Sequence, residues 1–193
     1  MSRSARDDRR KTIIPFYMNP RYYIKHMESI GLIKPVPSGA IEYALDLGCG
    51  KGEDSLYLAS LGFDVTSVDK ERNFEHAAII DISQYDIEDG KYSVIICNNV
   101  LPFMKDKHAV ERTISHMIFG LKKGGAAFIT LYGPHSCFKS REDMSFYGSA
   151  EICRYIKELP VDIMDMTTTE GYTKNGRGEL IYQHSHRFIL KKL

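Results

Sequence analysis

A glycine-rich turn that directly follows an apolar run is the part of this sequence best suited to hold a ligand. After the run at 44–47, Gly48, Gly50 and Gly52 occupy alternate positions. Because glycine has no Cβ, such a turn can bend sharply and bring its backbone within van der Waals contact of a ligand. The spacing G-x-G-x-G differs from the G-x-G-x-x-G of dinucleotide sites, and no Lys-Ser or Lys-Thr pair closes a P-loop here. The turn therefore predicts a nucleotide-cofactor site of another kind.

Two carboxylates accompany this turn. Asp46 precedes the first glycine, and Asp69 ends a second apolar run, at 63–68, about 20 residues beyond the loop. An acidic side chain at the tip of the second strand can accept hydrogen bonds from both hydroxyls of a ribose. The turn and the second acidic residue together are much more specific than either feature alone.

With these residues in place, the stretch ALDLGCGKGEDSLYLASLGFDVTSVDK at 44–70 resembles the class I S-adenosyl-L-methionine (SAM) dependent methyltransferases, most closely their tellurite and thiopurine methyltransferase branch. The resemblance covers most of the chain. It implies SAM as cofactor, methyl transfer as activity, and a seven-stranded sheet whose last strand is antiparallel.

The resemblance also implies roles for individual residues. Asp46 helps to position the methionine amino group, the glycine turn passes under the cofactor, Asp69 holds the ribose, and Asp81 with Ile82 contacts the adenine. The full set of expected cofactor-binding residues is Asp46, Gly48, Cys49, Gly50, Asp69, Lys70, Asp81, Ile82 and Asn98.

Apolar runs alternate with helical patterns along the chain, which predicts an α/β fold with an open, doubly wound, mostly parallel sheet of the Rossmann-like methyltransferase type. Strands are expected at 41–47, 63–68, 78–80, 92–97, 126–131, 161–166 and 180–190. Helices are expected after the Asn19-Pro20 cap, between Gly52 and Gly62, along 110–121, and from Ser149. The segment 170–179, with three glycines, is expected to be a loop.

One connection is too short for the usual pattern. Only residues 70–77 separate Asp69 from the third apolar run, whereas a parallel crossover normally needs a dozen or more residues. The helix after the second strand is therefore expected to be shortened or missing.

Composition limits the class of protein. The 193 residues suit a single domain at 12–193 after a basic, disordered tail at 1–11. The 26 Lys and Arg nearly balance the 25 Asp and Glu, so no global field favours a nucleic-acid partner. No apolar run has the length of a membrane span, no leader pattern opens the chain, and the four cysteines form no C-x-x-C pair. A cytoplasmic protein with no membrane partner is expected, and the sequence makes no prediction about its oligomeric state.

The acceptor side of the site is expected at the carboxyl ends of the strands. His135 is the candidate general base if the acceptor is a hydroxyl or an amine, and the loop at 133–148 is long enough to close over the site. If the acceptor is a thiolate or a chalcogen oxyanion, no proton has to be removed and nearby cations become more useful. The available cations are Lys139, Arg141, Lys174 and Arg177.

Missing motifs narrow the choice of acceptor. The segment at 98–103 contains neither the Asn/Asp-Pro-Pro-aromatic motif of amino-methylating enzymes nor the Pro-Cys nucleophile of cytosine-C5 enzymes, and paired acidic residues for magnesium are absent there. His184 and His186 share one face of the last strand, but without a third ligand nearby they predict no metal site. A small-molecule acceptor is favoured by elimination. Two alternatives stay open: an RNA or protein methyltransferase that docks through its basic tail, and a non-catalytic SAM-binding regulatory protein.

Overall fold

The chain folds around a seven-stranded sheet with the strand order β3-β2-β1-β4-β5-β7-β6. This computed structural model describes residues 21–174 and 178–193. The strands are β1 (Tyr43–Leu47), β2 (Asp64–Asp69), β3 (Ala78–Ile79), β4 (Tyr92–Cys97), β5 (Leu121–Tyr132), β6 (Val161–Lys174) and β7 (Leu180–Lys192). Strand β7 is antiparallel to both β5 and β6, and the other strand pairs are parallel, as expected.

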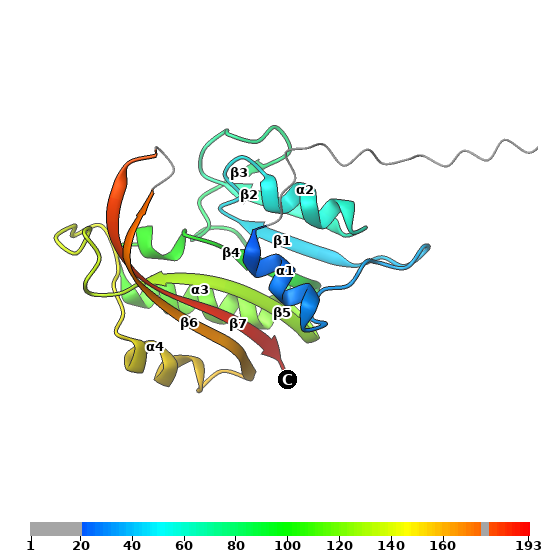
Figure 1. The fold of residues 1–193 in the computed structure, drawn as a ribbon. Coiled ribbons are helices and arrows are strands. Elements are labelled where there is room, and N and C mark those ends of the chain that lie inside the picture. The colour runs from blue at the N-terminus through cyan, green and yellow to red at the C-terminus, as the bar shows by residue number, and fades with distance from the viewer. Residues whose placement is uncertain (1–20, 175–177) are drawn as a thin grey trace, which may run out of the picture.

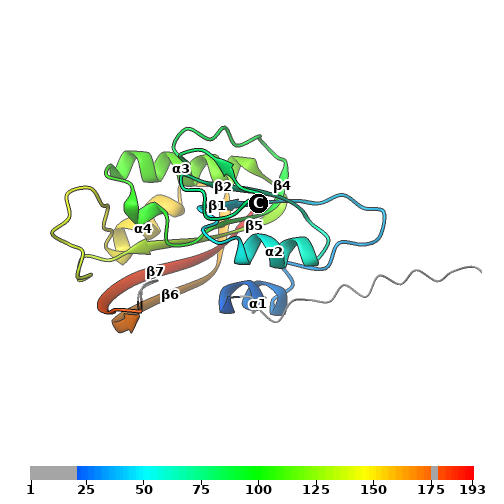
Figure 2. The same ribbon diagram turned by 90° about the horizontal axis from the view of Figure 1, so that it is seen from above.

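Helices cover both faces of the sheet (Figures 1 and 2). The helices α1 (Tyr22–Ser29) and α2 (Glu53–Ser60) lie on one face, and α3 (Lys107–Gly120) and α4 (Ser149–Ile156) lie on the other. Alternate residues of β4 enter the two cores: Val94 packs with α1 and α2, whereas Ile95 packs with α3 and α4. Every residue of β4 is buried, which explains its continuous apolar sequence.

Two expectations about the beginning of the chain fall on residues outside the described ranges. These are the basic tail at 1–11 and the helix cap at Asn19-Pro20. Helix α1 begins at Tyr22, and the ring of Tyr23 stacks on Phe128 of β5 with 3.8 Å between centroids. None of the helices within 21–174 and 178–193 combines the length and apolar content needed to cross a bilayer.

The expected loss of the helix after the second strand is confirmed. Residues 70–77 join β2 to β3 without a helix, and β3 has only two residues. The connection instead covers the glycine turn, because a Cβ built on Gly52 would lie 2.6 Å from the ring of Phe74. The short crossover therefore packs against the predicted cofactor site.

Two element boundaries differ from the expected ones. Helix α3 ends at Gly120, where a Cβ would lie 2.3 Å from Cγ2 of Ile87, and β5 begins directly at Leu121 with a register shift before Ala126.

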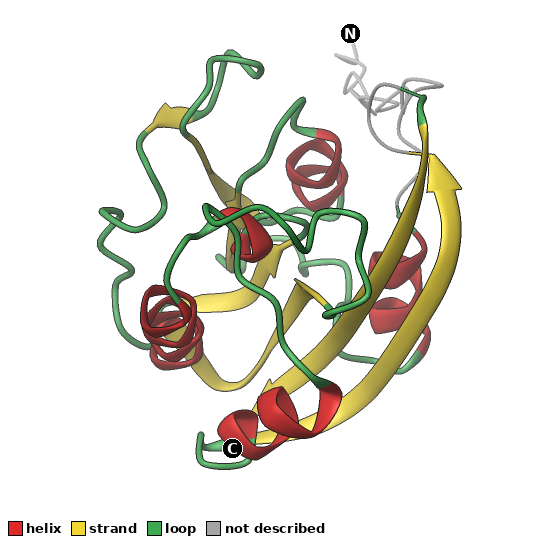
Figure 3. Cartoon of the chain, turned by 90° about the vertical axis from the view of Figure 1, so that its left-hand side faces the viewer, coloured by secondary structure: helices red, strands yellow, loops and turns green. Residues whose placement is uncertain are grey.

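The expected loop at 170–179 is also largely wrong, because β6 continues to Lys174 and pairs with β7 from Leu180 onward. Figure 3 shows this long hairpin as two curved strands. Its outer part lies beyond the core, so the ladder needs no apolar alternation there.

Candidate functional site

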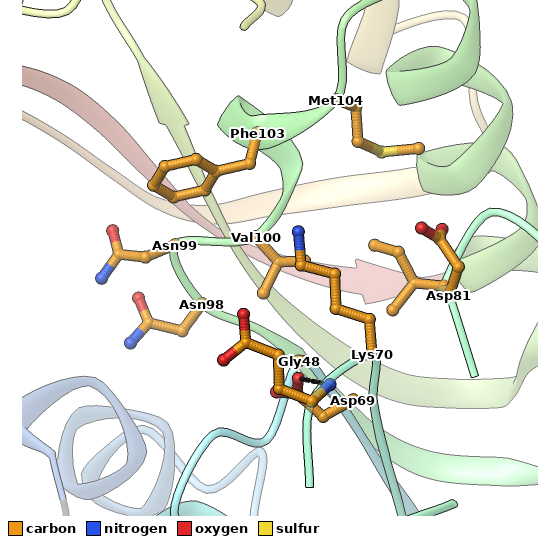
Figure 4. A pocket seen from close by; sticks show the side chains of 11 residues that line it. Gly48, Asp69, Lys70, Asp81, Asn98, Asn99, Val100, Phe103 and Met104 are labelled. Atoms are coloured by element: carbon orange, nitrogen blue, oxygen red, sulfur yellow. Dashed lines mark hydrogen bonds between the residues drawn. The ribbon is translucent and has the colours of Figure 1, made fainter. Parts of the chain in front are cut away.

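A pocket of about 350 Å³ lies at the carboxyl ends of the parallel strands, where open α/β sheets bind ligands. Figure 4 shows Asp69 at one side of it and Phe103 with Met104 at the other. The strand ends after β1, β2, β3 and β4 all contribute to its wall. The lining residues are Gly48, Asp69, Lys70, Glu71, Asp81, Ile82, Asn98, Asn99, Val100, Phe103 and Met104.

The glycine turn has the backbone that its sequence predicts. Gly48, Gly50 and Gly52 have φ values of 73°, 54° and 77°, a region that residues with a Cβ rarely adopt. The N–H groups of Gly48 and Cys49 both donate to the carbonyl of Val68, at 2.7 and 3.1 Å, which ties the turn to β2. A Cβ on Gly48 would lie 2.1 Å from Cγ2 of Val100, whereas a Cβ on Gly50 would meet nothing within 4 Å. The turn is thus closely packed on one side and open to a ligand at Gly50.

Asp69 connects this turn to the end of β2. The N–H of Gly50 donates to Oδ2 of Asp69 at 2.8 Å, and the N–H of Glu71 donates to Oδ1 at 2.9 Å. Both carboxylate oxygens are therefore held in place by backbone, and each keeps a second lone pair for a ligand. A carboxylate oriented in this way can accept hydrogen bonds from the two hydroxyls of a ribose.

Asp46 lies beneath the turn and is absent from the described part of the pocket wall. It is 2% exposed, and its Oδ2 accepts a hydrogen bond from Oγ of Ser55 at 2.6 Å. Ser55 in turn accepts one from Ser67 at 2.7 Å. Burial raises the pKa of Asp46 to about 7, with the Ser55 hydrogen bond opposing the rise. Asp46 is therefore linked to α2 and β2 rather than exposed to the pocket.

The other predicted cofactor residues also divide into those that line the pocket and those that are buried behind it. Lys70, Asp81, Ile82 and Asn98 line the pocket together with Gly48 and Asp69, whereas Cys49 is 7% exposed and burial raises the pKa of its thiol to about 12. The structure thus brings together six of the nine predicted residues as pocket wall, with Gly50 bonded to one of them.

Asn98 and Asn99 follow β4 and close the wall between the glycine turn and Phe103. Oδ1 of Asn98 accepts a hydrogen bond from Oγ1 of Thr130 at 2.9 Å, which fixes the orientation of its amide. Asn99 has a φ of 57°, a strained value for a residue other than glycine.

The sequence analysis did not predict Glu71 and Val100 as pocket residues. The short turn after Asp69 could have indicated Glu71, and the close packing needed at Gly48 could have indicated Val100.

His135 lies away from this wall, in the loop after β5. Its side chain is 64% exposed, and its Nδ1 lies 3.1 Å from Oε1 of Glu170. Within the described residues, the pocket lining does not include it. The loop is connected to the pocket wall indirectly, because Phe138 stacks on Tyr132 and Tyr132 meets Phe103 edge-on, both with 6.1 Å between centroids.

The candidate cations are arranged less favourably than expected. Arg141 pairs with Asp143 of its own loop. Lys139 and Lys174 are exposed and are not part of the pocket wall that the structure describes, and Arg177 lies outside the described residues. Lys70, expected as a cofactor residue, is the basic side chain on that described wall.

The two histidines of β7 have different surroundings. His186 is fully buried, with Nδ1 2.9 Å from Oγ1 of Thr168 and Nε2 3.0 Å from the carbonyl of Tyr147, and burial lowers its pKa. His184 instead lies beside His135, with 5.0 Å between ring centroids, and its ligand atom lies within 4.8 Å of those of His135 and Glu170. Two further candidate ligands that the sequence did not indicate therefore lie near His184, whereas His186 is not part of this group.

Comparison with known proteins identifies the family of this chain. The family described as Methyltransferase domain matches residues 20–185. YqeM of Bacillus subtilis, described as a methyltransferase, is 34% identical over 129 residues, which are 58% of this chain and 51% of YqeM. TehB of Haemophilus influenzae, described as a SAM-dependent methyltransferase, is 35% identical over 95 residues, 42% of this chain and 32% of TehB. The matched segments thus span about half or less of these relatives.

Solved structures show the same fold. The crystal structure of TehB from Haemophilus influenzae has a TM-score of 0.66 at 22% identity, covering 88% of this chain and 61% of TehB. A Burkholderia thailandensis 1,6-didemethyltoxoflavin-N1-methyltransferase, solved with that compound and S-adenosylhomocysteine, has a TM-score of 0.62 at 16% identity and covers 92% of this chain and 78% of its own.

Proposed function

This chain belongs to the SAM-dependent methyltransferases, and from that premise we propose that it transfers the SAM methyl group to a small-molecule acceptor, with a thiol or another soft nucleophile as the first candidate. The observation that carries the proposal is the hydrogen bond from Gly50 to Asp69. It joins the open turn and the ribose-type carboxylate at one end of a pocket whose other end is apolar.

The residues at the β1 and β2 end fit SAM. The space beside Gly50 is open, and a side chain at this position would fill it. Because glycine has no Cβ, the backbone of Gly50 can lie directly against the cofactor. Asp69 is oriented to accept the ribose hydroxyls, while Asp81 and Ile82 form the wall on which the adenine would rest. Oδ1 of Asp81 is itself held by the N–H and Oγ of Ser83, at 2.9 and 2.7 Å. SAM bound here supplies a methyl group on a positively charged sulfur.

The residues at the other end support an acceptor with an apolar part. Phe103 and Met104 line this end, and Tyr132 with Phe138 extends the aromatic surface toward the loop at 133–148. Such a wall excludes water and restricts the orientation of a small molecule.

Methyl transfer is an in-line displacement, so holding a lone pair close to the methyl carbon can supply much of the rate. A thiolate has that lone pair available without a general base. This matches a pocket wall that, in the part described, has no histidine.

The test has two parts. Calorimetry with SAM and with S-adenosylhomocysteine should show one site per chain, and transfer of labelled methyl from SAM should then be screened over thiols, selenite, tellurite and small-molecule extracts. Labelling of a low-molecular-weight thiol supports the proposal. Labelling of RNA or protein alone contradicts the small-molecule assignment. SAM binding with no transfer to any acceptor would instead mark a SAM-binding regulatory protein.

A further inference from the structure

Three side chains with metal-binding atoms meet at the edge of the molecule formed by the β6–β7 hairpin and the loop after β5. They are His135, Glu170 and His184, and their ligand atoms all lie within 4.8 Å of one another. Glu170 and His184 are direct partners in the antiparallel register of β6 and β7, so both side chains project from the same face of the hairpin. His135 comes from the loop after β5. The loop, β6 and β7 therefore contribute one ligand each.

The backbone holds the loop against the hairpin at this point. The N–H of Gly133 donates to the carbonyl of His184 at 2.8 Å, and the N–H of His135 donates a long hydrogen bond of 3.4 Å to Nδ1 of His184, which binding of an ion to this ring has to replace. A Cβ on Gly133 would lie 2.3 Å from that same Nδ1, so only glycine lets the loop pass so close to the imidazole. His184 is 7% exposed and is fixed by this packing.

The other two ligands can adjust. The side chains of His135 and Glu170 are 64% and 39% exposed. A tetrahedral ion with bonds of about 2.1 Å would bring its ligand atoms to about 3.4 Å from one another. Nδ1 of His135 and Oε1 of Glu170 are already 3.1 Å apart. To bind one ion together with His184, these two exposed side chains need to move only a short distance toward its buried imidazole.

The neighbours of the cluster resemble the outer shell of a metal site. The hydroxyl of Tyr182 donates to Oε1 of Glu170 at 3.0 Å and so orients the carboxylate. His186 is excluded as a ligand, because Thr168 and the carbonyl of Tyr147 already occupy both of its ring nitrogens.

We propose that His135, Glu170 and His184 form a binding site for one transition-metal dication of the Zn²⁺ class. Two imidazoles and one carboxylate, with a fourth position left open, are a donor set that Zn²⁺ accepts. Mg²⁺ and Ca²⁺ prefer oxygen ligands, so a site with two nitrogen ligands binds them weakly. The bound ion links the loop at 133–148 to the β6–β7 hairpin and thereby orders the side of the molecule that faces the aromatic end of the pocket.

The test uses the full chain without an affinity tag, freed of metal with a chelator, in the absence of SAM. Co²⁺ is titrated first, because its visible absorption reports nitrogen and oxygen coordination, and Zn²⁺ is then added in competition. We expect one equivalent of Zn²⁺ to displace Co²⁺, and Zn²⁺ to raise the melting temperature. Because no step involves SAM or an acceptor, this result is independent of the methyl-transfer proposal.

Variants assign the ligands. Glu170→Ala and His135→Ala change exposed side chains and should each weaken Zn²⁺ binding by more than about tenfold, and Tyr182→Phe by about 10- to 100-fold. The buried His184→Ala is informative only if its circular dichroism matches the wild type. His108→Ala, whose side chain is 94% exposed on α3, is the matched control and should bind as the wild type does.

Three results would overturn the assignment. The first is the lack of stoichiometric Zn²⁺ binding by the wild type, and the second is an affinity in Glu170→Ala and His135→Ala equal to that of the wild type. The third involves the exposed residue Cys137, whose N–H donates to the carbonyl of Tyr182 at 2.9 Å. If Cys137→Ser abolishes binding while Glu170→Ala keeps it, the ion is held by the thiol and not by this cluster.

Discussion

Asp46 accepts a 2.6 Å hydrogen bond from Oγ of Ser55 while only 2% of its surface reaches solvent. Ser55 lies on α2 and Asp46 on β1, so the bond joins the helix to the strand directly beneath the glycine turn. The carboxyl is desolvated and receives this hydrogen bond as its main compensation, which leaves its pKa raised to about 7.

The first prediction concerns pH and stability. The pKa of Asp46 rises from 3.8 in the unfolded chain to about 7 in the folded one, so between these values the folded state holds a proton that the unfolded state has lost. The free energy of unfolding should therefore fall as pH rises from about 4 to about 7, and the loss should level off above that. In Asp46→Asn this contribution is missing. Denaturant unfolding of both proteins without SAM, from pH 5 to pH 8, measures the difference, and parallel curves would contradict the prediction. Asp64→Asn, at the exposed start of β2, is the control.

The second prediction concerns the ribose carboxylate. Asp69→Ala removes charge-assisted hydrogen bonds of about 1.5–3 kcal/mol, so SAM affinity should fall roughly ten- to a hundredfold. Asp64→Ala changes the same residue type at the other end of β2 and should leave affinity unchanged. Calorimetry on both variants provides the comparison, and equal affinity in Asp69→Ala and the wild type would refute the role of Asp69.

The third prediction concerns the open position in the turn. Gly50→Val should abolish SAM binding and leave the chain folded, because the branched side chain would enter the space above the turn and resist its φ of 54°. Gly39→Val is the matched control, since Gly39 also has a positive φ of 83° and open space around its Cβ position. Circular dichroism and calorimetry separate strain from loss of the site. Retained SAM affinity in Gly50→Val would show that the turn does not face the cofactor.

The fourth prediction concerns the apolar end of the pocket. Phe103→Ala should raise the KM for the acceptor about tenfold, equivalent to about 1.4 kcal/mol, and leave SAM affinity unchanged. Phe119→Ala is a close control, because Phe119 is 49% exposed against 46% for Phe103 but lies on α3 outside the pocket. Steady-state kinetics with the acceptor found by labelling gives the answer. An equal effect of both substitutions would mean that Phe103 does not contact the acceptor.

The fifth prediction decides whether His135 acts as a base. A general base contributes about 10²–10⁴ to turnover, so a loss of that size in His135→Ala with unchanged SAM affinity would identify one. Since Nδ1 of His135 faces Glu170 and the described pocket wall lacks this residue, we expect a loss of less than about tenfold. The assay is run with a chelator present so that no bound metal contributes.

The sequence by itself determined the fold class and most of the residues that gather at the β1 and β2 end of the pocket. The reason is that the glycine turn depends on local backbone geometry: each positive φ in the turn favours glycine at its own position, independently of the rest of the chain. The alternation of apolar runs and helices likewise placed Asp69 at a strand end on the same edge as the turn. The short segment at 70–77 predicted the missing helix, because a connection between parallel strands needs a minimum number of residues to include one.

Only the tertiary structure decided the burial of Asp46 and the surroundings of His135. Whether a carboxylate at the end of a strand faces the ligand or a helix depends on how α2 packs, and the pattern of β1 is the same in both cases. The partners of His135 depend on the register between β6 and β7, which sets Glu170 opposite His184. The paired positions in that part of the hairpin carry polar side chains or glycine, so backbone hydrogen bonds set the register there and no hydrophobic pattern in the sequence specifies it.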